Sequence, residues 1–189
     1  GKWSIPGNSG TYSSTYLTFP RPSAYGGTSV TLSGNSTPGS IRFGMGGPNP
    51  NSDNSETGVH VRTWKWNENW SGSNDWETLS PDIPLLTFQG RAGSEVELND
   101  VGNTMIVSAP WSDAGGTKAG ELRIYSYASS SWSQLYPDVY LRGQSANKYC
   151  GDSAALSDDG KLIFIVCPRY DVVDQGIWYQ GRIRIYKLK

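Results

Sequence analysis

The sequence predicts an all-β protein built from repeated four-stranded antiparallel sheets, and three observations lead to this prediction. First, the composition favours short strands joined by glycine-rich turns, since 23 of the 189 residues are glycine, 12% are aromatic and only 17% are charged. Second, no apolar stretch with helical periodicity is long enough for an ordinary helix. Third, one sequence pattern recurs three times along the chain, which indicates a repeat architecture.

Each repeat opens with a glycine and a short alternating strand. Gly27 begins GTSVTLS, Gly93 begins GSEVELN and Gly151 begins GDSAALS, and the three align without gaps. A turn then leads into a second apolar run that ends in a small residue and a proline. These ends are Gly47-Pro48, Ala109-Pro110 and Cys167-Pro168. In the third copy the turn Asp158-Asp159-Gly160 favours positive φ at glycine, so residues 151–168 are expected to form the inner hairpin of a sheet.

The third and fourth strands of the repeat are marked by an arginine and a tryptophan motif. The third strands read VRTWKW, LRIYSY and IRIYKL around Arg62, Arg123 and Arg184. The fourth is W-x-x-L-x-P-D-[IV]-x-L, which begins at Trp76 and again at Trp132. Both faces of these strands are bulky, as expected when every sheet lies between neighbours. A unit of four strands that packs in this way is the blade of a β-propeller.

The chain is therefore predicted to be a single β-propeller domain, or a fragment of one, over residues 1–189. The expected blade repeats are 17–84, 85–140 and 141–189, with residues 1–16 supplying a closing outer strand. Three blades are fewer than the four to eight of a closed ring. The sequence leaves two completions open, a homo-oligomer or further blades of a longer chain.

The repeat resembles a known family. G-x-S-[VA]-x-L-S, a DG-type turn, an apolar strand ending in A-P or C-P, and then G-x-[LI]-R-I-Y are similar to the FG-GAP repeat of integrin-α-type propellers, from about Tyr25 to the C-terminus. The resemblance implies propeller blades, with ligand contacts on the rim formed by the 2–3 and 4–1 connections. Two features depart from the family. Gly26, Ala92 or Cys150 precedes the motif glycine in place of Phe, and the calcium loop D-x-[DN]-x-D-G is absent.

No cofactor is expected, because the turns between the first two strands are too short to wrap a cation. A weak calcium candidate is the run Asn51, Asp53 and Ser55, whose oxygen atoms alternate as in calcium loops. A polar surface loop is the favoured interpretation of this run.

Aromatic and acidic residues in the 2–3 loops are the candidate ligand-binding residues. Aromatic faces beside carboxylates suit sugar rings, which offer apolar C–H faces together with hydroxyls. The alternative is that these aromatic rings fill gaps between neighbouring blades. The candidates are Trp111, Asp113, Tyr170, Asp171, Trp178 and Tyr179.

The sequence also offers two candidate covalent modifications, a disulfide and N-glycosylation. Cys150 and Cys167 flank the inner hairpin of the third repeat and either form a disulfide or are two small buried residues, since Ala92 and Ala109 occupy the equivalent places in the second repeat. Asn35-Ser-Thr and Asn69-Trp-Ser match the N-glycosylation pattern.

Charge and residue inventory exclude several function classes. The net charge of −1 offers no basic field for nucleic acid, and no apolar run is long enough for membrane insertion. One histidine and no catalytic constellation indicate that the protein is not an enzyme. We expect a non-catalytic binding or adhesion module, extracellular or on a particle surface, that recognises a glycan or a protein through its loop rim. The alternative is a structural assembly subunit of a virion, fibre or extracellular filament.

Overall fold

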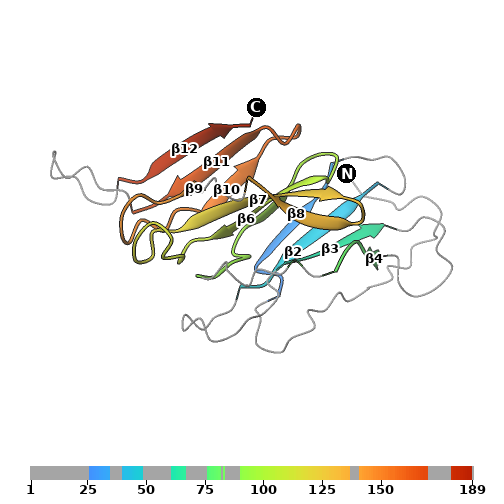
Figure 1. Ribbon diagram of the computed structural model, residues 1–189, viewed down its shortest axis with the longest axis horizontal. Coiled ribbons are helices and arrows are strands. Elements are labelled where there is room, and N and C mark those ends of the chain that lie inside the picture. The colour runs from blue at the N-terminus through green and yellow to red at the C-terminus, as the bar shows by residue number, and fades with distance from the viewer. Residues whose placement is uncertain are drawn as a thin grey trace, which may run out of the picture.

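The computed structural model describes residues 26–34, 40–48, 61–66, 76–81, 83, 90–136, 141–169 and 180–188. Over these residues the chain forms three antiparallel sheets and no helix (Figure 1). The prediction of an all-β protein with short antiparallel strands is confirmed. Within the same ranges there is consequently no helix of the length and hydropathy needed to span a membrane.

In each sheet the strands lie side by side in the order in which they follow along the chain, except that β9 of the second sheet pairs with β7. The first sheet contains β1 (Ser29–Leu32), β2 (Arg42–Gly46), β3 (Val61–Trp66) and β4 (Trp76–Thr78). The second contains β5 (Val96–Leu98), β6 (Thr104–Ala109), β7 (Glu121–Ala128) and β8 (Ser131–Leu135), and β9 (Leu141–Arg142) also pairs with β7. The third contains β10 (Ser153–Leu156), β11 (Leu162–Cys167) and β12 (Arg182–Lys187). The pairing of β9 thus adds the first residues of the expected third repeat to the second sheet.

The three motif glycines have the same conformation and the same hydrogen bond. Their φ angles are +85° at Gly27, +87° at Gly93 and +90° at Gly151, a region that L side chains rarely adopt. Each N–H donates to a carbonyl oxygen of the next strand at 2.9 Å, and the acceptors are Gly46, Ser108 and Val166. This shared left-handed turn at the entry to the first strand explains why glycine begins all three copies.

The first strands also share their register. Leu32, Leu98 and Leu156 each end the first strand of a sheet, and they lie opposite Phe43, Met105 and Ile163. The three sheets are therefore equivalent units aligned as the ungapped repeat predicts.

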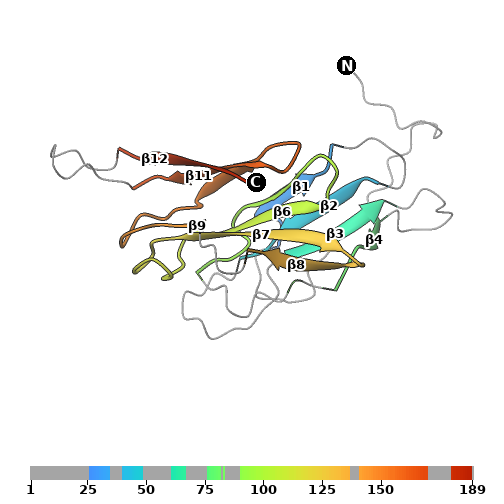
Figure 2. The ribbon, with the colours of Figure 1, turned by 45° about the horizontal axis from the view of Figure 1, so that its top comes forward.

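The second sheet lies between the other two (Figure 2). Val107 on one face of β6 joins a buried cluster with Val61 of the first sheet. Ile106 on the opposite face joins another with Ile163 and Ile165 of the third sheet. Because successive side chains of a strand point to opposite faces, a sheet buried on both sides is apolar at nearly every position. The described sheets form an open stack and do not close into a ring.

The contact between the first and second sheets is close and is hydrogen-bonded along one edge. A Cβ on Gly46 would collide with the carbonyl oxygen of Gly93. Only a glycine at position 46 therefore lets β2 approach the second sheet this closely. The hydroxyl of Ser29 accepts a hydrogen bond from the N–H of Val96 at 2.9 Å, and the next hydroxyl of β1 accepts from Leu98 at 3.0 Å. The edge strand β5 therefore satisfies its outward N–H groups with side chains of the neighbouring sheet.

Candidate binding site at the loop rim

Two loops at one end of the second and third sheets are bound together by backbone hydrogen bonds. One is the β6–β7 loop, 110–120, and the other is the β9–β10 connection, 143–152. Four N–H groups of the second loop donate to carbonyls of the first at 2.7–3.1 Å. The pairs are Gly143 to Gly120, Asn147 to Thr117, Tyr149 to Lys118 and Cys150 to Ala119. One is a 2–3 connection and the other a 4–1 connection, and at this place the two lie side by side.

Glycines permit this close approach. Gly120 has a φ of +84°, and a Cβ there would collide with the backbone of Cys150. Likewise, a Cβ on Gly115 would collide with the carbonyl group of Gly143. A larger residue at either position would push the two loops apart and disrupt the hydrogen bonds between them.

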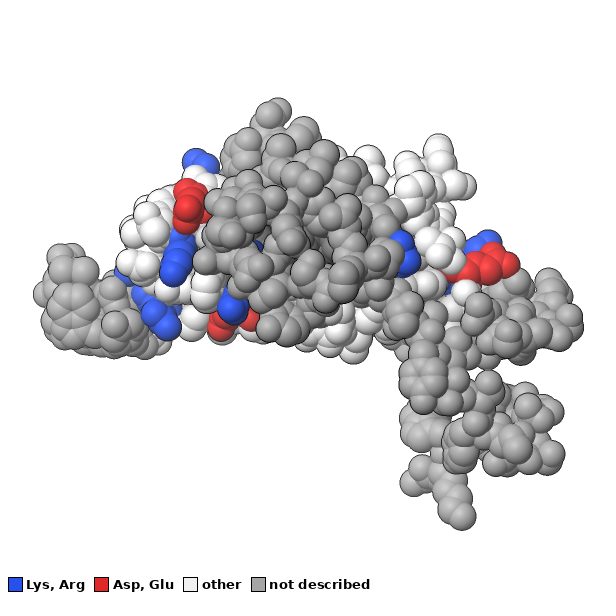
Figure 3. All heavy atoms as spheres, turned by 90° about the horizontal axis from the view of Figure 1, so that it is seen from below, with Lys and Arg blue, Asp and Glu red and all other residues white. Residues whose placement is uncertain are grey.

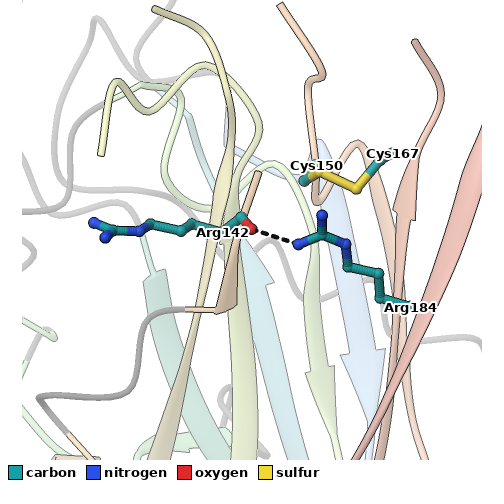
Figure 4. Close-up of a disulfide and its surroundings, with 4 residues drawn as sticks. All are labelled: Arg142, Cys150, Cys167 and Arg184. Atoms are coloured by element: carbon teal, nitrogen blue, oxygen red, sulfur yellow. Dashed lines mark hydrogen bonds between the residues drawn. A yellow bond between two sulfur atoms is a disulfide. The ribbon is translucent and has the colours of Figure 1, made fainter. Parts of the chain in front are cut away.

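A hollow of about 360 Å³ opens on this rim between the second and third sheets. The described residues that line it are Gly115, Arg142, Gly143, Gln144, Arg184 and Tyr186. Nη1 of Arg184 donates to the carbonyl oxygen of Arg142 at 2.8 Å, and Nη1 of Arg142 donates to that of Ala114 at 2.6 Å. Arg184 extends toward the backbone of Arg142, whose own guanidinium group points away from Arg184 (Figure 4). Among the described residues that line the hollow, Arg142 and Arg184 are cations and none is a carboxylate, so this part of the lining favours anionic groups.

Trp111 and Asp113 lie on the rim but outside the lining of the hollow. The guanidinium carbon of Arg91 is 3.8 Å from the Trp111 ring centroid, and Nζ of Lys118 is 4.6 Å from it. Tyr149 meets the same ring edge-on with centroids 6.3 Å apart. The indole therefore packs against neighbouring cations and an aromatic edge, as in the local-packing alternative. Asp113 Oδ1 accepts a hydrogen bond from the N–H of Lys118 at 2.8 Å and so closes the turn after β6.

Several sequence candidates lie outside the described residues. These are the ligand candidates Tyr170, Asp171, Trp178 and Tyr179, the calcium candidates Asn51, Asp53 and Ser55, the glycosylation candidates Asn35 and Asn69, and the expected closing strand in residues 1–16. Within the part of the chain that the structure describes, no group of three or more His, Cys, Asp or Glu residues is placed to hold a metal ion.

Cys150 and Cys167 form a disulfide, with their Cα atoms 4.0 Å apart. The register pairs Ser153 with Val166, so Cys150 precedes the strand and is not directly opposite Cys167. The left-handed turn at Gly151 brings it back toward the end of β11. The bond lies beside the junction of Arg142 and Arg184, and it fixes the third sheet where that sheet meets the rim (Figure 4).

Glu121 is a buried charged residue of the rim that the sequence interpretation missed. Its side chain is 2% exposed, Oε1 accepts from Nε of Arg123 at 2.8 Å, and Oε2 accepts from the hydroxyl of Ser112 at 2.9 Å. The sequence held the signal, because residues two apart on a strand share a face and Glu121 precedes the motif arginine by two. This carboxylate ties the start of the β6–β7 loop to β7.

Glu95 and Glu97, on β5, are a second pair that the sequence interpretation missed. Burial raises the pKa of both carboxyls, and the charge of Glu95 raises the pKa of Glu97 further. Ser29 donates to Glu95 at 3.1 Å and Thr31 donates to Glu97 at 3.3 Å, which oppose part of the shift in pKa. In the sequence both residues were interpreted only as alternating strand positions.

Replacing Glu97 with Gln is expected to raise the midpoint of thermal unfolding at neutral pH. The folded-state pKa of Glu97 lies above its ordinary value of 4.5, so the folded state binds the proton more tightly than the unfolded state. Wild-type stability therefore rises as the pH falls from above the raised pKa toward 4.5, and the advantage of the variant should vanish there. Gln keeps an oxygen for Thr31, and Glu95→Gln should behave in the same way. Thermal melts across this pH range test it, and a variant less stable than wild type at neutral pH would contradict it.

The chain matches no model of a known protein family, and no curated protein is significantly similar to it. Function is therefore inferred from the residues and their geometry.

Proposed function

We propose that this chain is a non-catalytic binding module of β-propeller blades that recognises a glycan or protein ligand through the hollow on its rim. The observation that carries the proposal is the arginine-lined hollow between the second and third sheets. Its chemistry selects an acidic ligand, such as a glycan that bears carboxylate or sulfate groups or an acidic protein loop.

The repeat supports the assignment of the sheets as blades. Equivalent glycine turns, equivalent registers and face-to-face packing are the features expected of neighbouring blades, and the FG-GAP-like motifs coincide with them. In the propellers that the repeat resembles, the rim of 2–3 and 4–1 connections contacts ligands. The hollow lies on that same rim, between Gly115 of one connection and Gln144 of another.

The lining groups suit a polar, acidic ligand. A guanidinium has five N–H donors, so the single bond of Arg184 to a carbonyl oxygen leaves it able to bind an anionic group as well. Gln144 and Tyr186 add an amide and a phenol, which can bind sugar hydroxyls or peptide groups. On the face of the molecule seen in Figure 3, the described Lys and Arg residues lie among Asp and Glu residues.

An extracellular or particle-surface location fits the disulfide. Bonds such as Cys150–Cys167 form and persist in oxidising compartments, and they are rare in the cytosol.

Arg184→Ala is expected to weaken binding of an acidic ligand by about tenfold or more, because it removes one of the two guanidinium charges among the described lining residues. The measurement is binding of the 189-residue chain to an array of sialylated, sulfated, uronic-acid-containing and neutral glycans and to acidic peptides, followed by titration of each hit. Arg91→Ala is the matched control, because Arg91 lies on the rim over Trp111 but does not line the hollow. Hits that are all neutral, or acidic hits that bind equally after Arg184→Ala, would refute the proposal.

A further inference from the structure

Both outer faces of the stack expose aliphatic side chains. On the first sheet Val30 and Leu32 are 59% and 60% exposed, and on the third sheet Ile183 and Ile185 are both 63% exposed. In each pair the residues are two apart on one strand, so they share a face. Contiguous exposed apolar residues of this kind mark a surface that binds something.

The second sheet shows what covers the face of Val30 and Leu32. The equivalent residues there are Val96 and Leu98, which are 0% and 6% exposed. They are buried against the first sheet, in the cluster that contains Val61. Ala154 of the third sheet, in line with Val30 and Val96, is likewise buried, and it packs against the second sheet. Twice within the chain, this face packs on the preceding sheet.

The second sheet also shows what covers the face of Ile183 and Ile185. The equivalent residues of β7 are Leu122 and Ile124, which are 0% and 3% exposed. They are buried against Ile163 and its neighbours on the third sheet. Val61 of the first sheet has the same position in the repeat and is fully buried against the second sheet. This face therefore packs on the following sheet.

We propose that the outer face of β11 and β12 in one copy docks on the outer face of β1 and β2 in a second copy of this chain. Each exposed face is the complement of the other, because the same two surfaces already meet twice inside the chain. Every copy of the chain carries both faces, so a second copy can cover either of them. The contact continues the stack of sheets in the same direction. This interface is independent of the rim hollow, since the side chain of Arg184 points to the other face of β12, toward the second sheet.

The equivalence also fixes the register of the contact. Ser153 is exposed and has the position of Ser29, whose hydroxyl accepts a hydrogen bond from Val96 N–H. In the assembly the hydroxyl of Ser153 accepts from the N–H of Val30 in the second copy. The two faces differ, so the contact is head-to-tail, and two copies supply six sheets. Six lies within the four to eight blades of closed propellers; a rotation that does not close gives a filament.

The test is the oligomeric state of the 189-residue chain by sedimentation velocity and native mass spectrometry. Wild type is expected to form a dimer or a larger species. One variant alters the third-sheet face, Ile183→Glu with Ile185→Glu, and the other alters the first-sheet face, Val30→Glu with Leu32→Glu. Each alone should be a monomer, because an unpaired charge at a buried contact abolishes association. An equimolar mixture should form a one-to-one pair, because each variant keeps the face that the other lacks.

Val101→Glu is the matched control, since Val101 is 50% exposed in the β5–β6 turn and lies on neither face. It should associate as wild type does, and circular dichroism should show all variants folded, because the substituted side chains are exposed. A folded wild-type chain that stays monomeric at its highest soluble concentration overturns the proposal. A first-sheet variant that becomes monomeric while the third-sheet variant still dimerises also overturns it, because that pattern describes a two-fold contact between like faces. The Arg184→Ala variant, which tests the rim, should retain association.

Discussion

Replacing Glu121 with alanine is expected to lower the free energy of unfolding by about 3–5 kcal/mol. The substitution leaves Arg123, whose side chain is 13% exposed, without its carboxylate partner, and it removes the acceptor of the Ser112 hydroxyl. The guanidinium of Arg123 keeps the cost of its desolvation but loses the attraction of the carboxylate that offset it. Denaturant unfolding under oxidising conditions, with the disulfide intact, measures the change.

The chain supplies a matched control in its exposed ion pair. Lys65 and Glu77 are 3.0 Å apart, but their side chains are 45% and 46% exposed. Glu77→Ala should therefore cost less than about 1 kcal/mol, since water replaces the lost partner. A double variant, Glu121→Met with Arg123→Met, should lose less stability than Glu121→Ala alone, because it removes both charges of the pair. Equal losses from Glu121→Ala and Glu77→Ala would show that burial does not set the strength of the pair.

The repeat predicts the sheets well because it encodes backbone conformation directly. Gly27, Gly93 and Gly151 begin their copies since only glycine readily adopts the left-handed φ needed there, and this places every following strand in the same register. Alternation then assigns each strand residue to a face. Stacking of the sheets follows from apolar residues on both faces. Ring closure does not follow, because it depends on what covers the outermost faces.

The described residues that line the hollow were not among the ligand candidates that the sequence offered. The sequence predicted aromatic loop residues such as Trp111 as ligand contacts, whereas the described lining of the hollow includes Arg142, Gln144 and Arg184. Arg142 ends β9 and Gln144 lies in the β9–β10 connection, both outside the motifs that define the repeat. Arg184 was recognised from the sequence only as the recurring arginine of the third strands. Which loop side chains converge depends on how neighbouring sheets approach each other, and strand periodicity carries no information on that approach.

The cysteine pair illustrates the same limit. Alternation and register decide cross-strand pairs only for residues inside paired strands. Cys150 precedes β10, and its position is set by the turn at Gly151. The sequence could therefore show that a bond was sterically reasonable, but it could not distinguish the bond from two small buried residues like Ala92 and Ala109.

Replacing Cys150 and Cys167 together with alanine is expected to destabilise the third sheet by about 3 kcal/mol. The disulfide spans 17 residues, and its loss restores the conformational freedom of that loop in the unfolded chain. The packing should change little, because the second sheet already holds alanines, Ala92 and Ala109, at the equivalent buried places. Wild type treated with a reductant should match the double variant. Hydrogen exchange of β10–β12 measures the change, since a stack of repeats can lose one sheet before the others.

The size of this effect should depend on assembly. The third sheet is covered by the second on one face, while Ile183 and Ile185 leave its other face exposed in a single copy. Docking of a second copy would cover that face and stabilise the third sheet. In the monomer this stabilisation is missing, so the third sheet depends more on the disulfide. The alanine pair should therefore accelerate exchange in β10–β12 more in the monomeric Ile183→Glu, Ile185→Glu background than in the assembled protein. Equal acceleration in both backgrounds would mean that the outer face of β12 gains no cover when copies associate.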